Sequence, residues 1–176
     1  MRTLIIMVTL LVAPTWVAPT VPTPPIVNNV EEKKEEIIKN MDLFLLDLGF
    51  QESGNRYDVV NRFGYMGKYQ FGKSTLRTLK IKVTKEAFLN SPDLQEYAMQ
   101  QLLLHNKRKL QKYINDFDGQ IIHCILVTES GLLAAAHLGG QGSVKKWFRN
   151  GKITQDGNGV KITHYMQKFG GYNLGF

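Results

Sequence analysis

The chain has 176 residues, of which 43% are apolar and 21% are charged. This length suits one globular domain and excludes two domains of ordinary size, and the composition is typical of a soluble protein. The excess of 22 basic over 15 acidic residues gives a net charge of +7. That charge favours an anionic partner such as nucleic acid, a membrane surface or an acidic wall polymer.

Residues 1–18 have the pattern of a signal peptide, with an uncleaved anchor as the alternative. The apolar run at 3–13 has the length of a signal-peptide core, whereas a membrane-spanning helix needs about 20 such residues. Five of the six prolines lie between residues 14 and 25, which predicts an extended Pro-rich linker at 19–30. The folded domain is therefore expected at 31–176, in an exported protein of the periplasm, the cell envelope or the medium.

Apolar periodicity predicts a long first helix from about residue 32 to residue 53. Acidic residues at 31–36 suit the positive end of the helix dipole. The apolar residues that recur at helical spacing, and so share one face, are Ile37, Met41, Phe44, Leu45 and Leu48.

Capping signals predict the remaining helices. Ser91 is a good N-cap and Pro92 follows it at the first helical position of a second long helix. Thr128 can cap a third helix that ends at Gly139 and Gly140. Two short helices are expected at 144–148 and 162–169. No segment alternates strongly enough to demand a sheet, so the predicted fold class is mainly α.

Two segments stay ambiguous: 121–127 fits a buried strand or part of a helix, and 60–85 could hold a small hairpin. Cys124 is the only cysteine, which excludes an intrachain disulfide and a Cys-based zinc site, and it is expected to be a small buried hydrophobe. His123, in the same apolar run, is expected in the core. The four histidines show no metal-ligand spacing, so no metal and no other cofactor is expected.

The triplet Glu-Ser-Gly occurs twice, and its two carboxylates are predicted to lie in opposite environments. Glu52 follows Leu48 by four residues, so it extends the apolar face at the C-terminal end of its helix. Partial burial and the negative helix pole both disfavour the ionised form there, as a general acid working near neutral pH requires. Glu129 falls in a first helical turn, where its expected role is to stabilise the helix. The structural alternative for Glu52 is an exposed residue at a frayed helix end.

The loop after Glu52 combines glycines, amides and aromatic rings. Gly64, Gly67 and Gly72 permit tight turns and a close approach of a ligand to the backbone. Rings such as Tyr69 can stack on sugars and amides such as Gln70 can hydrogen-bond to them. The alternative is a tightly packed loop whose rings fill the core.

Several short motifs follow one another in a fixed order across most of 36–172. A long apolar helix ends in Glu52-Ser53, and Gly67-Lys68-Tyr69-Gln70 fits Gly-x-x-Gln. Residues 135–139 fit Ala-Tyr-Asn-x-Gly in part, with Ala136 and His137 at the tyrosine and asparagine. "GSVKKWFRNG" fits Gly-x-Val-x-x-Trp, and residues 165–169 fit Tyr-x-x-Lys-apolar. In this order the motifs resemble the lytic transglycosylase branch of the lysozyme superfamily, whose members cut the glycan strands of peptidoglycan.

The resemblance implies a lysozyme-like helical fold and a reaction with one carboxylate. Glu52 would protonate the glycosidic oxygen between N-acetylmuramic acid and N-acetylglucosamine, and would then act as base on the muramyl 6-hydroxyl, closing a 1,6-anhydro ring. The resemblance implies that Gln70 hydrogen-bonds the sugar near Glu52 and that Tyr165 orients the acid. Ser53, Tyr69 and His137 are further candidates for substrate contacts. For His137 a bond to the last carbonyls of its helix is the alternative, and for Tyr165 ordinary core packing.

The expected partner is the peptidoglycan glycan strand, bound by a monomer, with membrane contact only through the N-terminal segment. A hydrolytic muramidase is the nearest rival, and it would need a second carboxylate, for which Asp58 is the only acidic residue in the loop after Glu52. A non-catalytic glycan-binding or phage virion protein is the rival outside enzymes, and "GKYQF" also resembles versions carried by phages. Nucleic acid is not expected, because the basic cluster at 105–113 comes without a nucleic-acid motif.

Overall fold

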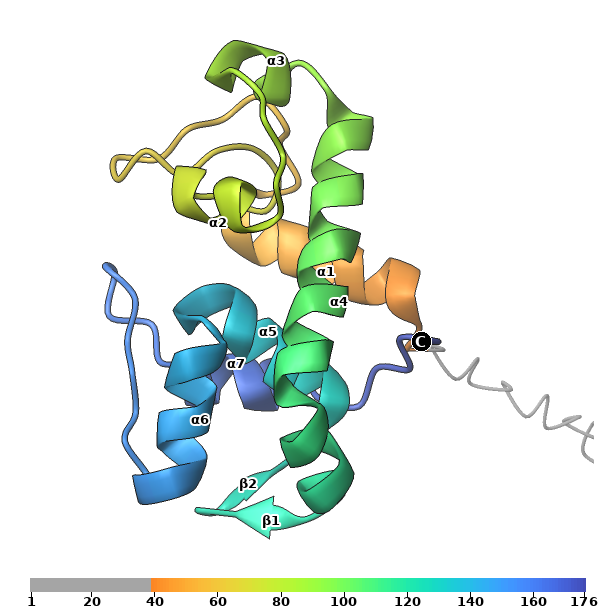
Figure 1. Cartoon of the computed structure of the whole chain (residues 1–176), viewed down its shortest axis with the longest axis vertical. Helices are drawn as coiled ribbons and strands as arrows, with labels where there is room; N and C mark the ends of the chain where they lie inside the picture. Colours follow the sequence, from red (N-terminus) through yellow and green to blue (C-terminus); the bar gives the residue numbers. More distant parts are fainter. Residues whose placement is uncertain (1–38) are drawn as a thin grey trace, which may run out of the picture. The chain divides into compact units, whose positions relative to one another are not determined.

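Helix α4 (Pro92–Phe117) is the longest element and extends from one end of the domain to the other (Figure 1). The computed structural model describes residues 39–176, so the predicted segments 1–18 and 19–30 and the acidic run 31–36 lie outside the described residues. The described residues belong to one compact unit with seven helices and one two-stranded antiparallel sheet. This confirms the prediction of a mainly helical fold. Within this part of the chain, no helix has both the length and the apolar character that crossing a membrane requires.

Helix α1 (Met41–Ser53) starts later than predicted. Asn40 has an extended backbone, and its side chain accepts a hydrogen bond from the N–H of Leu43 at 3.0 Å, so it caps the helix and the predicted start near 32 is wrong. Phe44 and Leu48 are buried on one face, as the periodicity predicts. The N–H of Asn173 donates to the carbonyl just before the cap at 2.8 Å, which ties the C-terminal segment to the start of α1.

Helix α4 begins as predicted. The Ser91 side chain accepts a bond from the N–H of Leu94 at 3.4 Å, and Pro92 occupies the first turn. Two short helices, α2 (Lys73–Thr78) and α3 (Lys85–Leu89), precede it. The small hairpin that residues 60–85 could hold does not form, because that stretch contains α2 and only isolated bridges.

The hairpin lies instead at 121–126, where β1 (Ile121–Ile122) pairs with β2 (Ile125–Leu126). His123 and Cys124 form its two-residue turn with φ of 48° and 63°, the left-handed pair that such tight turns require. Both side chains are exposed at this tip, so the expectation of burial is wrong for each. The strands stay marginal in length, and packing of Ile125 into the core holds them.

Helix α5 (Glu129–Gly139) forms the centre of the second half of the domain, packed between α4, α6 (Gln141–Asn150) and α7 (Ile162–Lys168) (Figure 1). Thr128 caps it by accepting a bond from the N–H of Gly131 at 3.1 Å, and it ends before Gly140, as predicted. Gly131 also permits the close packing of α7, because a Cβ there would lie 2.5 Å from the carbonyl oxygen of Met166. The buried residues of α5 include the alanines at 134–136.

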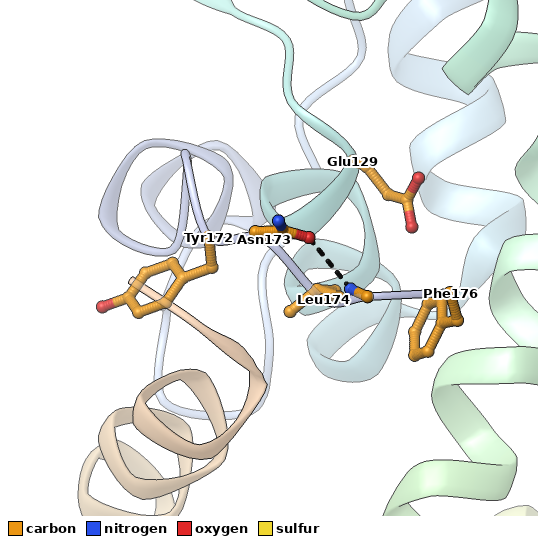
Figure 2. A pocket seen from close by; sticks show the side chains of 6 residues that line it. Glu129, Tyr172, Asn173, Leu174 and Phe176 are labelled. Atoms are coloured by element: carbon orange, nitrogen blue, oxygen red, sulfur yellow. Dashed lines mark hydrogen bonds between the residues drawn. The ribbon is translucent and has the colours of Figure 1, made fainter. Parts of the chain in front are cut away.

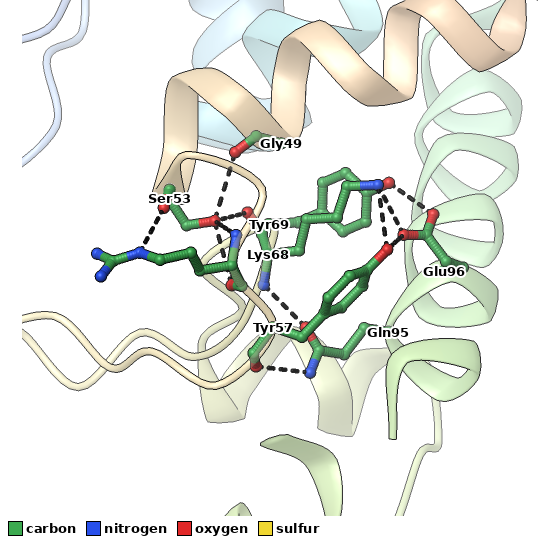
Figure 3. Close-up of polar contacts among 8 residues, drawn as sticks. Gly49, Ser53, Tyr57, Lys68, Tyr69, Gln95 and Glu96 are labelled. Carbon is green, nitrogen blue, oxygen red and sulfur yellow. Dashed lines mark hydrogen bonds and ion pairs between the residues drawn. The ribbon is translucent and has the colours of Figure 1, made fainter. Parts of the chain in front are cut away.

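A polar network fixes the loop between α1 and α2 against α4 (Figure 3). Glu96 of α4 accepts hydrogen bonds from Tyr57, Lys68 and Tyr69 at 2.6 to 2.8 Å. Gln95 accepts a hydrogen bond from the N–H of Lys68 at 2.8 Å. The preceding residue, Gly67, has a φ of +73°, and a Cβ at this position would collide with the Gln95 side chain. These bonds reach across more than 25 residues of sequence, so they determine where the glycine-rich loop lies.

We expect Glu96→Gln to lower the free energy of unfolding at pH 7 by about 2 kcal/mol, because it leaves the ammonium of Lys68, only 10% exposed, without its countercharge. Burial raises the pKa of Glu96, but the hydrogen bonds from Lys68 and two tyrosines lower it more, so its net pKa lies below the ordinary 4.5. A lowered folded-state pKa contributes stability above pH 4.5 that is lost as the pH falls through the folded value. The difference between the two proteins should therefore shrink between pH 5 and strongly acidic pH.

Urea denaturation at pH 7, 5 and 3 measures both effects. Glu86→Gln is the control, because that side chain is 73% exposed with its nearest cation 3.9 Å away. Equal stability of Glu96→Gln and the wild type at pH 7 would show that the network does not hold the loop.

Candidate functional site

A cleft of about 710 Å³ opens between the two halves of the domain. Its walls come from the end of α1, the loop at 61–72, the middle of α4, the junction of α5 with α6, and the loop at 154–160. Tyr165 of α7 completes the lining. Segments more than 100 residues apart in sequence therefore meet around one space.

Glu52 lies in the last turn of α1 and lines this cleft. Position 52 follows Leu48 by one helical turn, so the side chain leaves the helix on its buried face. The carboxylate is 14% exposed, so it is neither sealed in the core nor free in solvent. Tyr165 donates a hydrogen bond from its hydroxyl to Glu52 Oε1 at 2.6 Å.

Tyr165 is a permanent hydrogen-bond donor at this position. Burial raises the pKa of its hydroxyl far above the ordinary value, and the charge of Glu52 and the hydrogen bond to it act in the same direction. The phenol therefore keeps its proton at every physiological pH. Because α7 is packed on α5, the ring is rigid and fixes the orientation of the Glu52 carboxylate.

His137 approaches the same carboxylate from α5. Its Nε2 lies 3.6 Å from Glu52 Oε1, and its side chain is 7% exposed, with the ring edge-on to Phe71. The sequence indicated a more exposed side chain, but the ring is turned inward because the last turn of α5 faces the cleft. Its Nδ1 is buried and has no hydrogen-bond partner among residues 39–176.

Gln70 also lines the cleft, from a strained turn. Its φ is +52°, and its Nε2 donates to the carbonyl of Gly67 at 2.8 Å, closing the Gly67–Gln70 turn. The Gly-x-x-Gln motif thus uses its glycine for the left-handed start of the turn and its glutamine for the close.

Ser53 and Tyr69 do not line the cleft, although both are predicted substrate contacts. The Ser53 hydroxyl donates to the carbonyl of Lys68 at 2.8 Å and accepts from the N–H of Arg56 at 3.0 Å (Figure 3). Tyr69 is fully buried, and its hydroxyl donates to Glu96 at 2.6 Å. Both side chains are therefore committed to holding the loop, and neither has a free polar group to offer a ligand.

The structure adds lining residues that the sequence analysis did not single out. Asp156 lines the cleft, whereas Asp58, the second carboxylate considered from the sequence, does not. Asp156 Oδ1 accepts bonds from the N–H groups of Asn158 and Val160 at 2.9 and 2.7 Å. Asp followed by Gly-Asn-Gly is a turn signal, and no local pattern brings that turn near Glu52.

The rim of the cleft contains exposed aromatic rings and a contact between two loops. Phe63 and Tyr65 line the cleft and are 48% and 46% exposed, and the guanidinium of Arg62 lies over the Phe63 ring at 4.7 Å from its centroid. Arg62 Nη2 donates to Asn158 Oδ1 at 2.9 Å, and a Cβ at Gly157 would lie 3.1 Å from the Phe63 ring. The loop after α1 and the loop before α7 thus touch each other at the rim.

The arrangement brings groups that can exchange protons to one open space. One part-buried carboxylate is oriented by a phenol and flanked by an imidazole, with exposed aromatic side chains and hydroxyls of α2 nearby. Among the described residues, no group of three or more His, Cys, Asp or Glu is placed to hold a metal ion.

A second, smaller hollow of about 340 Å³ lies at the C-terminal segment (Figure 2). Glu129 borders it from the first turn of α5, the position predicted for it, and pairs with Lys107 at 2.9 Å. The carboxylate is thus neutralised by a neighbouring cation and acts as a helix-end charge. The two Glu-Ser-Gly triplets thus lie at opposite helix ends: Glu52 lines the cleft, whereas Glu129 forms an ion pair with Lys107.

Comparison of the chain with protein-family models, with curated proteins and with solved structures gives no match.

We expect Ser53→Ala to lower the free energy of unfolding by about 1 kcal/mol, because it removes the hydroxyl that joins the end of α1 to the loop at Lys68. Ser143→Ala is the control, because Ser143 is a part-exposed serine in the first turn of α6 and does not lie at the junction of α1 with the loop. Denaturant titration of the three proteins measures the effect. Ser53→Ala matching the wild type in stability would contradict the structural role assigned to this hydroxyl.

Proposed function

We propose that this protein is a peptidoglycan lytic transglycosylase with a lysozyme-like catalytic domain. One observation carries the proposal: Glu52, part-buried at the end of an apolar helix, is held by Tyr165 inside a cleft of about 710 Å³. That volume lies within the range of small-molecule sites and suits several sugar residues of a glycan. The helical architecture and the order of the sequence motifs support the fold assignment.

Glu52 would act first as general acid and then as general base. Its proton passes to the glycosidic oxygen as the bond from that oxygen to the muramyl C1 breaks, and the N-acetylglucosamine end leaves with a free 4-hydroxyl. The muramyl 6-oxygen then bonds to C1, and its proton returns to the carboxylate. The sugar product carries a 1,6-anhydro ring, no water is consumed, and the enzyme is restored.

Tyr165 would orient the carboxylate through both steps. A carboxyl that gives and then recovers a proton must keep one oxygen directed at the sugar. The hydrogen bond at 2.6 Å fixes Oε1 and leaves Oε2 as the oxygen that meets substrate. His137 beside Oε1 restricts the carboxylate from the other side.

The cleft and the charge suit a wall glycan. Phe63 and Tyr65 offer exposed aromatic surface for sugar contacts at the rim, and Gln70 and the hydroxyls of α2 offer polar contacts. The net charge of +7 favours association with a wall that carries carboxylates and phosphates. We propose a monomeric, exported enzyme without a cofactor that acts in the cell envelope or in a phage particle or lysis system.

A hydrolytic muramidase is the second candidate, because Asp156 lies on the same cleft as Glu52. A second carboxylate could activate water or stabilise a glycosyl intermediate. Its Oδ1 is already occupied by two backbone N–H groups of its own turn, which favours a structural role and keeps the transglycosylase as the first proposal. A glycan-binding protein without turnover is the outcome if no cleavage occurs.

We expect Glu52→Gln to lower the rate of peptidoglycan cleavage by about 1,000-fold, since the amide cannot exchange a proton with the sugar. Glu129→Gln is a matched control from the second Glu-Ser-Gly triplet, outside the cleft, and should keep near wild-type activity. Release of soluble muropeptides from purified cell wall measures both. Equal clearing by the wild type and Glu52→Gln would remove the catalytic assignment.

The product decides between the two enzymes, and Asp156→Asn tests the rival directly. Asparagine keeps the Oδ1 that accepts the two turn bonds, so the fold should persist. For a transglycosylase, mass spectrometry shows 1,6-anhydro ends before and after the substitution, with the rate changed by less than about 10-fold. For a muramidase, the wild type would instead produce reducing ends that contain an oxygen from labelled water. Asp156→Asn would then lose this product, and its cleavage rate would fall by at least about 100-fold.

A further inference from the structure

Asn106 is a buried polar residue on the cleft that the proposed reaction does not use. It lies in the middle of α4, is 3% exposed, and lines the same space as Glu52. Its Nδ2 is buried and has no hydrogen-bond partner among residues 39–176. Buried amides in native proteins are nearly always paired, so an unpaired one in a cleft is a position where a ligand can supply the partner.

The unpartnered atoms are not spread evenly through the described part of the domain. Three buried side-chain atoms there lack a partner: Asn55 Oδ1, Asn106 Nδ2 and His137 Nδ1. Two of the three residues line the cleft. By contrast, the polar side chains of the network around Glu96 bond to one another.

We propose that Asn106 recognises the acetamido group of an N-acetylated amino sugar bound in the cleft. This inference rests on the proposed function and names one determinant of its specificity. A carboxamide carries a donor and an acceptor side by side, which matches the carbonyl oxygen and the N–H of an acetamido group. Leu102 precedes Asn106 by one helical turn, is nearly buried and also lines the cleft, so it provides an apolar contact for the acetyl methyl.

The surroundings favour a neutral amide over an anionic group. Asn106 carries no charge, and its neighbour His105 lines the same wall. Burial and the positive charges of Lys109 and Arg108 lower the pKa of His105, so its imidazole is neutral at neutral pH. A carboxylate or phosphate at this wall would therefore meet no charged partner from these two residues.

The test compares Asn106→Leu with the wild type on two substrates: intact glycan strands and strands from which the acetyl groups have been removed. We expect the wild type to cleave the acetylated strands at least about 10-fold faster, and Asn106→Leu to bring that ratio close to one through a raised KM on the acetylated strands. Asn115→Leu, the same change at an exposed position of α4, should keep the wild-type ratio. An unchanged ratio in Asn106→Leu overturns the inference. A rate lost equally on both substrates also overturns it, because the stem-peptide amides present on both would then be the recognised group.

Two further measurements separate this inference from its premise. The melting temperature of Asn106→Leu should equal or exceed that of the wild type, because the change removes an unpaired buried amide, whereas a structural amide would give a lower value. Calorimetric titration with N-acetylchitotetraose and with its de-N-acetylated form reports recognition without turnover. If the wild type cleaves no wall yet binds only the acetylated form, and Asn106→Leu loses that preference, the proposed function fails and the acetamido site stands. Equal binding of the two forms by the wild type overturns the site.

Discussion

The hydrogen bond from Tyr165 to Glu52 is the interaction on which the candidate site depends, because it joins residues 113 positions apart at a distance of 2.6 Å. For it to form, the end of α1 and the middle of α7 must meet at one wall of the cleft. The packing of α7 on α5, made close by Gly131, fixes one partner. The burial of Phe44 and Leu48 fixes the other. The site is thus a consequence of core packing, and a change in either helix would move the carboxylate relative to its orienting phenol.

Local signals in the sequence predicted much of the helical framework. The caps at Ser91 and Thr128 and the glycine end of α5 depend on residues within four positions of each other, so single-chain patterns are sufficient to identify them. The start of α1 was missed because the acidic run at 31–36 resembles a helix start, while Asn40, a better cap, lies inside the periodic stretch. The hairpin was left ambiguous because its turn uses His123 and Cys124, where asparagine and glycine would give a clear signal.

Long-range contacts explain what the patterns could not predict about the site. Tyr69 and Ser53 are predicted to contact substrate, yet their polar atoms are bound to Glu96 and to the Lys68 carbonyl. Nothing within the loop itself indicates those partners. Asp156 joins the cleft only because the loop before α7 folds back toward Phe63. Residues that only the tertiary structure brings together have no fixed spacing in the sequence, so a motif cannot identify them. Here they include Asp156 and Asn106.

Paired polar groups predominate in the network around Glu96, and two of the three unpaired buried atoms of the described residues belong to residues that line the cleft. Where α4 faces the glycine-rich loop, Glu96 and Gln95 have hydrogen-bond partners. These bonds make the contact rigid and offset the free-energy cost of burying the polar groups. On the side that faces the cleft, Asn106 and His137 keep buried nitrogens without partners. An unmet hydrogen bond there destabilises the free protein, and a bound ligand that supplies the partner recovers that free energy. A domain selected for stability alone would replace both residues by apolar ones of similar volume. The unpaired amide of Asn106 beside an oriented carboxylate is the observation from which the proposed acetamido site is inferred.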